Sequence, residues 1–312
     1  MQSPALLHRF LPIRQVTPVS FLHNHAKRIE KLNEKFKEKN SKELWLKEHG
    51  PGGSVKHSTP YSSKQIEQIT LDFAKKKNAL TGSMMYDFSS IVKKVVRDTT
   101  HRVVVVRGAN GSFCSGGDLN FVEKIASEEG AFVMNSVMMN AVNKLARSDK
   151  VSIAVLEGFT MGGGTELASA CDIRVAKKNA KVGFVQGRMG VCPGWGGGRY
   201  LVETLGRARA IEYLTTAAEV TAEELHRIGY VNFVYDSEEE LESYLNRFNA
   251  LRTDPFIASK RMVANYSRES SLSEEEKEMK EQLIFMSVWG QNDHKDNIHH
   301  IRQSIKAKKE KK

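Results

Sequence analysis

Hydrophobic and polar positions follow two distinct periods along this chain of 312 residues. Residues 66–73, IEQITLDF, alternate between apolar and polar, which is typical of a strand with one buried face. Two β-branched runs, HRVVVVRG (101–108) and VSIAVLEG (151–158), predict strands buried on both faces. Residues 172–184, DIRVAKKNAKVGF, predict two further short strands.

Segments with helical spacing separate these strands. Apolar residues recur with a helical period over residues 79–95 and 132–145, and residues 197–216 predict one helix followed by another. Beyond Glu238 the composition is helical and charged, with a capped helix start at Ser271 or Ser273. Strands that alternate with helices predict a layered α/β domain.

The domain boundaries follow from breaks in this pattern. A charged helical stretch over residues 29–47 ends at HGPGGS (49–54), which interrupts the chain. We expect an N-terminal extension over residues 1–50, a core over 51–238 and a C-terminal helical region with a basic tail over 239–312. The sequence has no internal repeat and no linker long enough to separate independent domains.

Composition limits the class of protein. The 40% hydrophobic and 27% charged residues are typical of a globular protein, and no run reaches the roughly eighteen apolar residues that a membrane span needs. Cys114, Cys171 and Cys192 are far apart and predict neither disulfides nor zinc ligation. Because no histidine is paired with Cys or Glu at ligand spacing, we expect no metal site.

The net charge of +10 raises the question of an anionic partner. Basic residues are spread along the chain with much of the excess at its ends, which favours a solvated surface or a small polyanionic ligand over nucleic acid. Residues 1–29 contain no acidic residue, as in a mitochondrial presequence, but Pro4, Pro12 and Pro18 interrupt an amphipathic helix there. We expect a cytosolic protein, with the mitochondrial matrix as the alternative.

Each of the two buried strands ends in a glycine-rich loop. RGANGSFCSGGDL (107–119) follows the first strand and EGFTMGGGTELASACD (157–172) follows the second. Ligands bind at the carboxyl ends of parallel strands, where glycine exposes the main chain and a helix N-terminus presents free N–H donors. Two such donors from separate loops can hold one oxygen as it becomes negative, which is an oxyanion hole.

Two explanations fit the three adjacent glycines. Gly162, Gly163 and Gly164 can clear side chains from the approach of a substrate, so that the Gly163 N–H points at it and Glu166 lies in the first turn of the next helix. Tight strand-to-helix packing explains the same residues, with Glu166 as a simple first-turn acid. The loops lack the P-loop, dinucleotide-binding and Gly-x-Ser-x-Gly patterns.

Four segments resemble one known superfamily. SFCSGGDL, EGFTMGGGTELASACDIRVAKKNAKVGF, MGVCPGWGGGRYLVETLG and VTAEELHRIGYVNFVY are similar, in this order, to the enoyl-CoA hydratase/isomerase, or crotonase, superfamily. The resemblance implies an α/β fold of repeated ββα turns in a spiral, with C-terminal helices that pack onto neighbouring subunits in a homotrimer or hexamer. It also implies that the N–H groups of Gly117 and Gly163 hold the carbonyl of an acyl-CoA thioester.

The resemblance extends to the CoA moiety. It implies that the backbone around Ala79 contacts the adenine, that Lys75 and Lys76 approach the phosphates, and that Ser115 and Gly116 belong to the same binding loop. Lysines suit this role because the CoA phosphates are strongly anionic. CoA is then part of the substrate, and we expect no separate cofactor, no nucleic acid and no membrane partner.

One departure from the hydratase pattern bears on the reaction. Hydratases carry two glutamates, one matching Glu166 and one at the position of Gln186. Adding water to a double bond suits a pair of carboxylates, and Gln186 cannot titrate. PGGSV, KNALTGSMM, PGWGG and SVWG resemble the decarboxylases of the superfamily, which implies decarboxylation of a short branched malonyl-type thioester, ethylmalonyl-CoA or methylmalonyl-CoA, in metabolite proofreading.

The roles of three side chains stay open at this point. Glu166 can orient the substrate or a water, or protonate the enolate carbon, and uncharged Gln186 suits a neighbour of an anionic carboxylate. Trp195 belongs to the acyl pocket or to the core. The alternative functions are an enoyl-CoA isomerase, which needs one base, and an RNA-binding or scaffold protein on the same fold.

Overall fold

The computed structural model describes residues 18–63, 65–267 and 272–310 and divides the chain into two compact units. The first unit ends at Ser41 and contains helix α1 (Pro18–Lys35). The second unit begins at Lys42, within α2 (Ser41–His49), and contains both sheets. Most of the segment that resembles a presequence lies outside the described residues.

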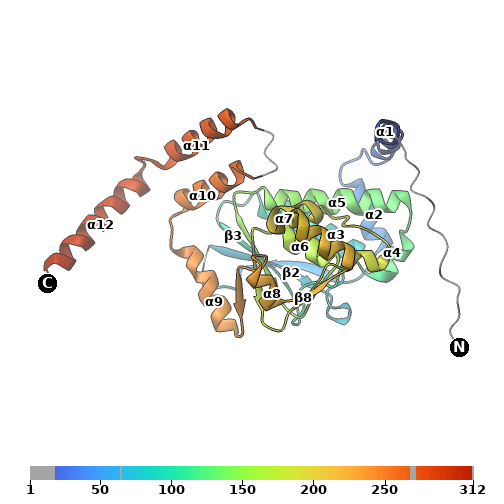
Figure 1. Ribbon diagram of the computed structural model, residues 1–312, viewed down its shortest axis with the longest axis horizontal. Coiled ribbons are helices and arrows are strands. Elements are labelled where there is room, and N and C mark those ends of the chain that lie inside the picture. Colours follow the sequence, from blue (N-terminus) through green and yellow to red (C-terminus); the bar gives the residue numbers. More distant parts are fainter. Residues whose placement is uncertain (1–17, 64, 268–271, 311–312) are drawn as a thin grey trace. The chain divides into compact units, whose positions relative to one another are not determined.

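The main sheet of the second unit has six strands (Figure 1). In spatial order they are β1 (Ser54–Ser58), β2 (Ile66–Asp72), β3 (Val103–Gly108), β4 (Val151–Leu156), β6 (Ile173–Lys177) and β9 (Phe233–Tyr235). Only the β1–β2 pair of this sheet is antiparallel. The predicted strands over 66–73, 101–108 and 151–158 are confirmed as β2, β3 and β4.

A second sheet begins directly after β4. It contains β5 (Phe159–Met161), β7 (Lys181–Gly183) and β8 (Glu219–Thr221), with β5 and β7 parallel. The chain thus leaves one sheet and enters the other at the glycine-rich loop after β4. An isolated bridge between Cys114 and Thr160 joins the first glycine loop to β5.

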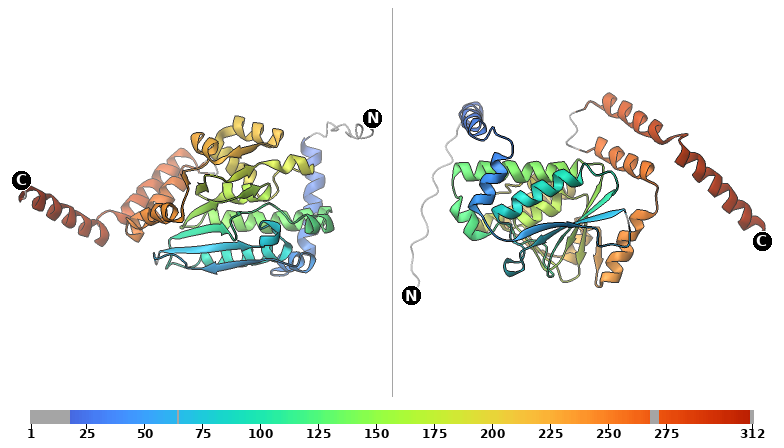
Figure 2. Two further views of the ribbon diagram at one scale, coloured as in Figure 1. Left: turned by 90° about the horizontal axis from the view of Figure 1, so that it is seen from below. Right: turned by 180° about the vertical axis from the view of Figure 1, so that it is seen from behind.

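Helices connect and flank the strands (Figure 2). They are α3 (Gly82–Val95), α4 (Leu119–Lys124), α5 (Glu128–Ala146), α6 (Gly163–Ala170), α7 (Gly197–Thr216), α8 (Ala222–Arg227), α9 (Glu238–Asn246), α10 (Thr253–Asn265), α11 (Glu274–Val288) and α12 (Asn292–Glu310). Three short 3₁₀ helices are η1 (Ala74–Lys76), η2 (Val185–Met189) and η3 (Arg247–Asn249). Within the described ranges, no helix has the length and apolar character needed to cross a bilayer.

Two helix boundaries refine the sequence predictions. The helix predicted from residue 79 begins only at Gly82, because the Thr81 side chain caps it by accepting a hydrogen bond from the Met84 N–H. Ala79 therefore lies in the preceding loop, and its place in the predicted helix is wrong. Gly206, with φ 75° and ψ 165°, breaks α7 into the two predicted helices.

The core occupies both faces of the sheet. Val103 to Val106 of β3 are all fully buried, although successive side chains point to opposite faces. One face packs against Leu241 and Leu245 of α9 and Phe256 of α10. Burial of each such side chain stabilises the fold by about 1.5–3 kcal/mol, so the sheet is a rigid support for the loops at its edge.

The predicted helical C-terminus is confirmed as α9 to α12. Ser273 caps α11 through a capping box with Glu276, whereas Ser271 lies outside the described residues. The Arg252 guanidinium contacts Asp293 at 2.7 Å and Asp296 at 3.2 Å, which ties the start of α10 to α12.

Candidate active site

A buried asparagine organises the loop after β3. The Asn78 Oδ1 accepts a hydrogen bond from the Phe73 N–H at 2.8 Å, and its Nδ2 donates to the carbonyl oxygens of Ala109 at 2.8 Å and Ser112 at 2.7 Å. Asn78 is fully buried and has φ 58°, a conformation that asparagine tolerates. One side chain thus fixes both the segment before α3 and the start of the first glycine loop.

The end of the same loop pairs with the segment before α3 and leaves one donor unused. The Leu80 N–H donates to the Gly116 carbonyl at 2.8 Å, and the Asp118 N–H donates to the Leu80 carbonyl at 2.9 Å. In this parallel bridge the N–H of Gly117 takes no part. Nothing in the described parts of the chain accepts a hydrogen bond from it.

The three adjacent glycines are required for three different reasons. A Cβ on Gly162 would meet nothing within 4 Å, but the residue has φ +51°, which L side chains rarely adopt. A Cβ on Gly163 would lie 2.5 Å from the ring of Trp195, and one on Gly164 would lie 2.2 Å from the Cys114 carbonyl oxygen. Packing explains Gly164, whereas only Gly162 borders open space.

Gly163 begins α6 and carries the second unused donor. The N–H groups at the start of a helix have no intrahelical acceptor, and no described residue accepts from the Gly163 N–H. A Cβ on Gly116 would lie 3.6 Å from the Gly163 nitrogen, so the two glycine loops meet here. The structure thus brings Gly116, which directly precedes the Gly117 amide, next to the Gly163 amide, from the loops that follow β3 and β4.

Glu166 is directed toward the turn before α7. Its Oε1 accepts a hydrogen bond from the Gly194 N–H at 3.0 Å, and its Oε2 accepts from the N–H groups of Trp195 at 2.7 Å and Gly197 at 3.1 Å. Burial raises the pKa of this carboxyl group, and the three N–H donors act in the opposite direction because they stabilise the ionised form. Glu166 therefore holds the segment that carries Trp195.

Trp195 lies beside both unused donors. Its indole ring is 2.5 Å from the position of a Cβ on Gly163 and 3.9 Å from that of a Cβ on Gly117. Trp195 is 4% exposed, and its backbone N–H donates to the Glu166 carboxylate. The Asn135 Nδ2 adds a further tie by donating to the Gly194 carbonyl at 2.6 Å. An apolar wall thus borders the two amides.

Gln186 reaches the second glycine loop from η2. Its Nε2 donates to the Gly162 carbonyl oxygen at 3.0 Å, and it is 6% exposed. The Oε1 of the same amide has no partner among the described residues. Gln186 thus contacts the backbone next to the Gly163 donor.

The residues expected to bind CoA lie around the first loop. The Ser115 Oγ donates to the Lys76 carbonyl at 2.8 Å, and the Lys76 ammonium is 3.3 Å from Asp118. Lys75 is exposed in η1, and Ala79 is buried directly before α3. The structure brings these residues together with Gly116, and their contact with CoA stays a prediction.

Sequence reasoning missed three residues that support the site: Asn78, Asn135 and Thr165. Asn78 follows three lysines in a turn-like segment, so asparagine itself was a usable turn signal there. Asn135 lies within a helix, and its partner Gly194 is 59 residues away. No local pattern indicates such a contact.

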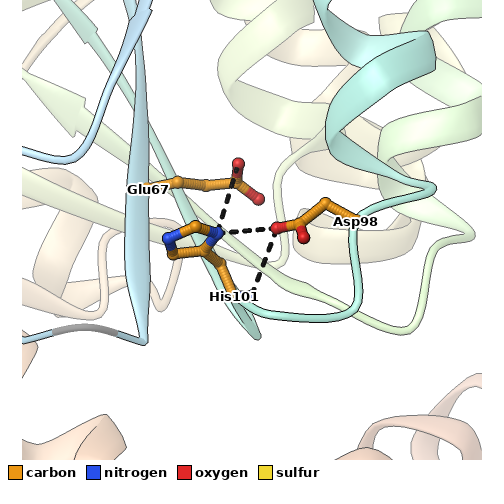
Figure 3. A group of neighbouring side chains, drawn as sticks. All are labelled: Glu67, Asp98 and His101. Carbon is orange, nitrogen blue, oxygen red and sulfur yellow. Dashed lines mark hydrogen bonds and ion pairs between the residues drawn. The ribbon is translucent and has the colours of Figure 1, made fainter.

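A second polar group lies at the opposite end of the strands (Figure 3). Glu67, Asp98 and His101 place potential ligand atoms within 4.8 Å of one another, although the histidine spacing predicted no such group. The Lys150 ammonium donates to Glu67 at 2.6 Å and to Asp98 at 3.3 Å. Lys150 is 4% exposed and supplies the positive charge that the carboxylates require, so the group is a buried ion network.

Comparisons with known proteins point to one family. The sequence profile described as enoyl-CoA hydratase/isomerase matches residues 62–312. The chain is 30% identical to ethylmalonyl-CoA decarboxylase of Rattus norvegicus over 271 residues, 85% of each protein. It is 33% identical to the protein of the same name from Danio rerio, over 77% of this chain and 81% of that one.

Solved structures share the fold. An enoyl-CoA hydratase from Bacillus anthracis matches with a TM-score of 0.73 at 23% identity, covering 81% of this chain and 97% of that chain. One from Thermoplasma volcanium matches with a TM-score of 0.72 at 25% identity, covering 79% and 96%. The predicted crotonase-like α/β fold is confirmed. Because the family profile and these relatives cover most of its length, the chain belongs to the enoyl-CoA hydratase/isomerase family.

Proposed function

We propose that this protein decarboxylates a short branched malonyl-type acyl-CoA, ethylmalonyl-CoA and also methylmalonyl-CoA. The observation that carries the proposal is the meeting of two unused backbone donors, at Gly117 and Gly163, beside the indole of Trp195. Relatives named ethylmalonyl-CoA decarboxylase, at about 30% identity over most of the chain, support the same reaction. Removal of a wrongly carboxylated thioester is metabolite proofreading.

The chemistry needs stabilisation of one oxygen. The bond between the α-carbon and the carboxylate breaks, CO₂ leaves, and the electron pair passes into a thioester enolate. Negative charge then collects on the thioester oxygen, where the N–H groups of Gly117 and Gly163 donate to it. Each such donor contributes about 3 kcal/mol to a transition state of this type. A proton taken up from solvent at the α-carbon completes the acyl-CoA product.

The surroundings of the donors favour decarboxylation over the other reactions of the family. Hydration suits two carboxylates, and Gln186 has none to offer. Isomerisation needs a base directed at the substrate, whereas three of the roughly four lone-pair sites of the Glu166 carboxylate accept hydrogen bonds from the turn around Trp195.

The CoA part of the substrate would lie along the first loop. Lys75 and Lys76 in η1 are exposed and Lys76 lies beside Ser115, so both would approach the phosphates, and we propose that the backbone at Ala79 contacts the adenine. Removal of the Lys75 charge is expected to raise KM with little effect on kcat, because phosphate contacts contribute equally before and during the reaction.

A panel of thioesters tests the proposed function. The purified protein is incubated with ethylmalonyl-CoA, methylmalonyl-CoA, a 2-enoyl-CoA and a 3-enoyl-CoA, and CO₂ and acyl-CoA products are quantified. We expect CO₂ and the decarboxylated acyl-CoA from the first two substrates. Conversion of the 3-enoyl-CoA to its conjugated isomer, with both malonyl-type esters left intact, would contradict the proposal and identify an isomerase.

A basic groove supports the alternative of an anionic macromolecular partner. It has a volume of about 620 Å³ and is lined by residues including Lys93, Arg97, Lys144 and Arg147 at the ends of α3 and α5. Cations at helix C-termini also stabilise the helix dipole, which explains them without a partner. Binding of RNA with a steep salt dependence, together with no thioester turnover, would favour this alternative.

We also propose a homo-oligomer assembled through the C-terminal helices. Exposed apolar side chains on α11 and at its C-cap support it, among them Met279, Leu283 and Met286 on the helix and Trp289 directly after it. Light scattering of the purified chain tests this proposal, since a monomer would contradict it. Cytosolic rather than matrix localisation stays a proposal that imaging of the tagged full chain can decide.

A further inference from the structure

The Gly162 carbonyl oxygen is the most heavily used acceptor in the site. It accepts from the Thr165 N–H at 2.9 Å, the Thr165 hydroxyl at 2.6 Å and the Glu166 N–H at 3.3 Å. Those donors belong to the first turn of α6. The fourth donor is the Gln186 Nε2 at 3.0 Å, which comes from η2 and is 24 residues away along the chain.

The Gly162 carbonyl and the Gly163 N–H belong to the same peptide group. That group is planar and trans, so its carbonyl and its N–H point in opposite directions. Whatever fixes the direction of the Gly162 oxygen therefore fixes the direction of the Gly163 hydrogen. Gly162 has no side chain to restrain this peptide and has φ +51°, so the restraint has to come from the donors on its oxygen.

The orientation of the Gln186 amide shows which of its groups matters. The Oε1 is buried without a partner among the described residues, an arrangement that costs about 1–3 kcal/mol. Rotation of the amide by half a turn would place Oε1 against the Gly162 oxygen, and two acceptors repel. The side chain is thus held with its donor on the Gly162 carbonyl and its acceptor unsatisfied.

We propose that Gln186 is a positioning residue, which holds the Gly162–Gly163 peptide plane so that the Gly163 N–H points at the thioester oxygen. This inference rests on the proposed function in one respect, because it requires that the Gly163 N–H donates to the oxyanion. The Gln186 amide contacts the Gly162 carbonyl, and a hydrogen bond from the same side chain also lowers the pKa of the neighbouring Glu166 carboxyl group. A glutamate at this position cannot do the same when ionised, because a carboxylate has no hydrogen to donate to the Gly162 carbonyl.

Two substitutions of Gln186 separate the donor from the volume of the side chain. Gln186→Met keeps the length and loses the donor, and we expect kcat for decarboxylation to fall at least tenfold with KM changed less than about threefold, as for an interaction realised in the transition state. Gln186→Glu regains a donor only when the introduced carboxyl group is protonated. The buried Glu166 carboxyl group faces this position, so the two carboxyl groups would titrate as a pair, which favours protonation of one of them. The activity of Gln186→Glu relative to the unsubstituted protein should therefore rise as the pH falls.

Further variants supply the controls. Met189→Ala changes an exposed side chain in the same turn and should leave kcat and the pH profile unchanged. Thr165→Val removes the other side-chain donor on the Gly162 oxygen. Because both side chains restrain one atom, the loss in Thr165→Val/Gln186→Met should exceed the product of the two single losses.

A readout without turnover keeps this inference separate from the proposed function. Difference infrared spectroscopy of bound butyryl-CoA, ¹³C-labelled at the thioester carbonyl, reports the hydrogen bonds to that oxygen. We expect a lowered stretching frequency in the unsubstituted protein and a smaller shift in Gln186→Met. Equal shifts, or Gln186→Glu with full and pH-independent activity, would overturn the role of Gln186. Absence of decarboxylation by the unsubstituted protein would refute the proposed function, and the infrared comparison would still decide the inference.

Discussion

The two ends of the parallel sheet contain opposite kinds of polar site. At the amino ends of β2, β3 and β4, Glu67 and Asp98 share the ammonium group of Lys150, and His57 and His101 also contact these carboxylates. At the carboxyl ends of β3 and β4, the glycine loops leave the N–H groups of Gly117 and Gly163 without acceptors. At the charged end the polar groups pair with one another. At the end with the glycine loops, two backbone N–H groups remain available to a ligand.

This difference shows that titratable residues alone are a poor guide to a site. The ion network has the potential metal ligands, yet Lys150 fills it, whereas the glycine loops offer two peptide N–H groups that no described residue accepts from. Peptide N–H groups are normally paired with the chain or with water, so two half-buried donors without an acceptor in the described chain, in the loops after β3 and β4, are the more informative observation.

The largest change in catalytic activity is expected from removal of the Gly163 N–H donor. Gly163→Pro deletes the N–H, and proline is tolerated at the first position of a helix. Gly163→Ala is the matched control, because its Cβ meets the Trp195 ring in the same way while its N–H remains. We expect kcat of the proline variant to be about 100- to 1,000-fold below that of the alanine variant. Equal kcat values in the two variants would remove Gly163 from the oxyanion hole.

The charged end should respond in stability rather than activity. Lys150→Met leaves the fully buried Glu67 carboxylate without its nearest cation, and we expect a loss of about 3–5 kcal/mol in the free energy of unfolding. Denaturant unfolding measures it. Glu67→Gln/Lys150→Met removes both charges and should be markedly more stable than the single variant. A fall in kcat of the folded single variant would contradict the separation between the two ends.

Glu166 tests the role of a carboxylate at the end of the sheet with the glycine loops. Glu166→Gln keeps one acceptor oxygen and turns an NH₂ group toward backbone N–H donors, so we expect a loss of about 1–3 kcal/mol in unfolding free energy. Fluorescence of Trp195 should change with it, and Glu203→Gln in exposed α7 surface is the control. If Glu166→Gln were as stable as the unsubstituted protein, the proposed hold on the Trp195 turn would be wrong.

The smallest effect concerns pH at the charged end. Although burial opposes it, hydrogen bonds from His101 and Thr100 hold the pKa of Asp98 below its ordinary range. A depressed folded-state pKa means that Asp98 stabilises the protein above its ordinary pKa of about 4, and this contribution is lost as the pH falls further. The midpoint of urea unfolding should therefore decline less steeply below about pH 4 in Asp98→Asn than in the unsubstituted protein. Identical slopes would show that Asp98 does not contribute.

Much of the fold and part of the site could be predicted from the sequence alone. Several features are local properties of the sequence. They include the buried strands over 101–108 and 151–158, the glycine loops that follow them, and glutamine instead of glutamate at position 186. Strand and helix periods report burial of neighbouring residues, so they can be recognised within a few positions. The family resemblance rests on the same local motifs.

The tertiary structure alone decided what the side chains do. Glu166 was identified as the acid after the glycines, but its partners lie 28 to 31 residues further along the chain. Lys150 meets Glu67 across 83 residues, and Gln186 meets the Gly162 carbonyl across 24. A hydrogen bond depends on distance and direction between atoms, and only the folded chain brings atoms from separate elements within that range.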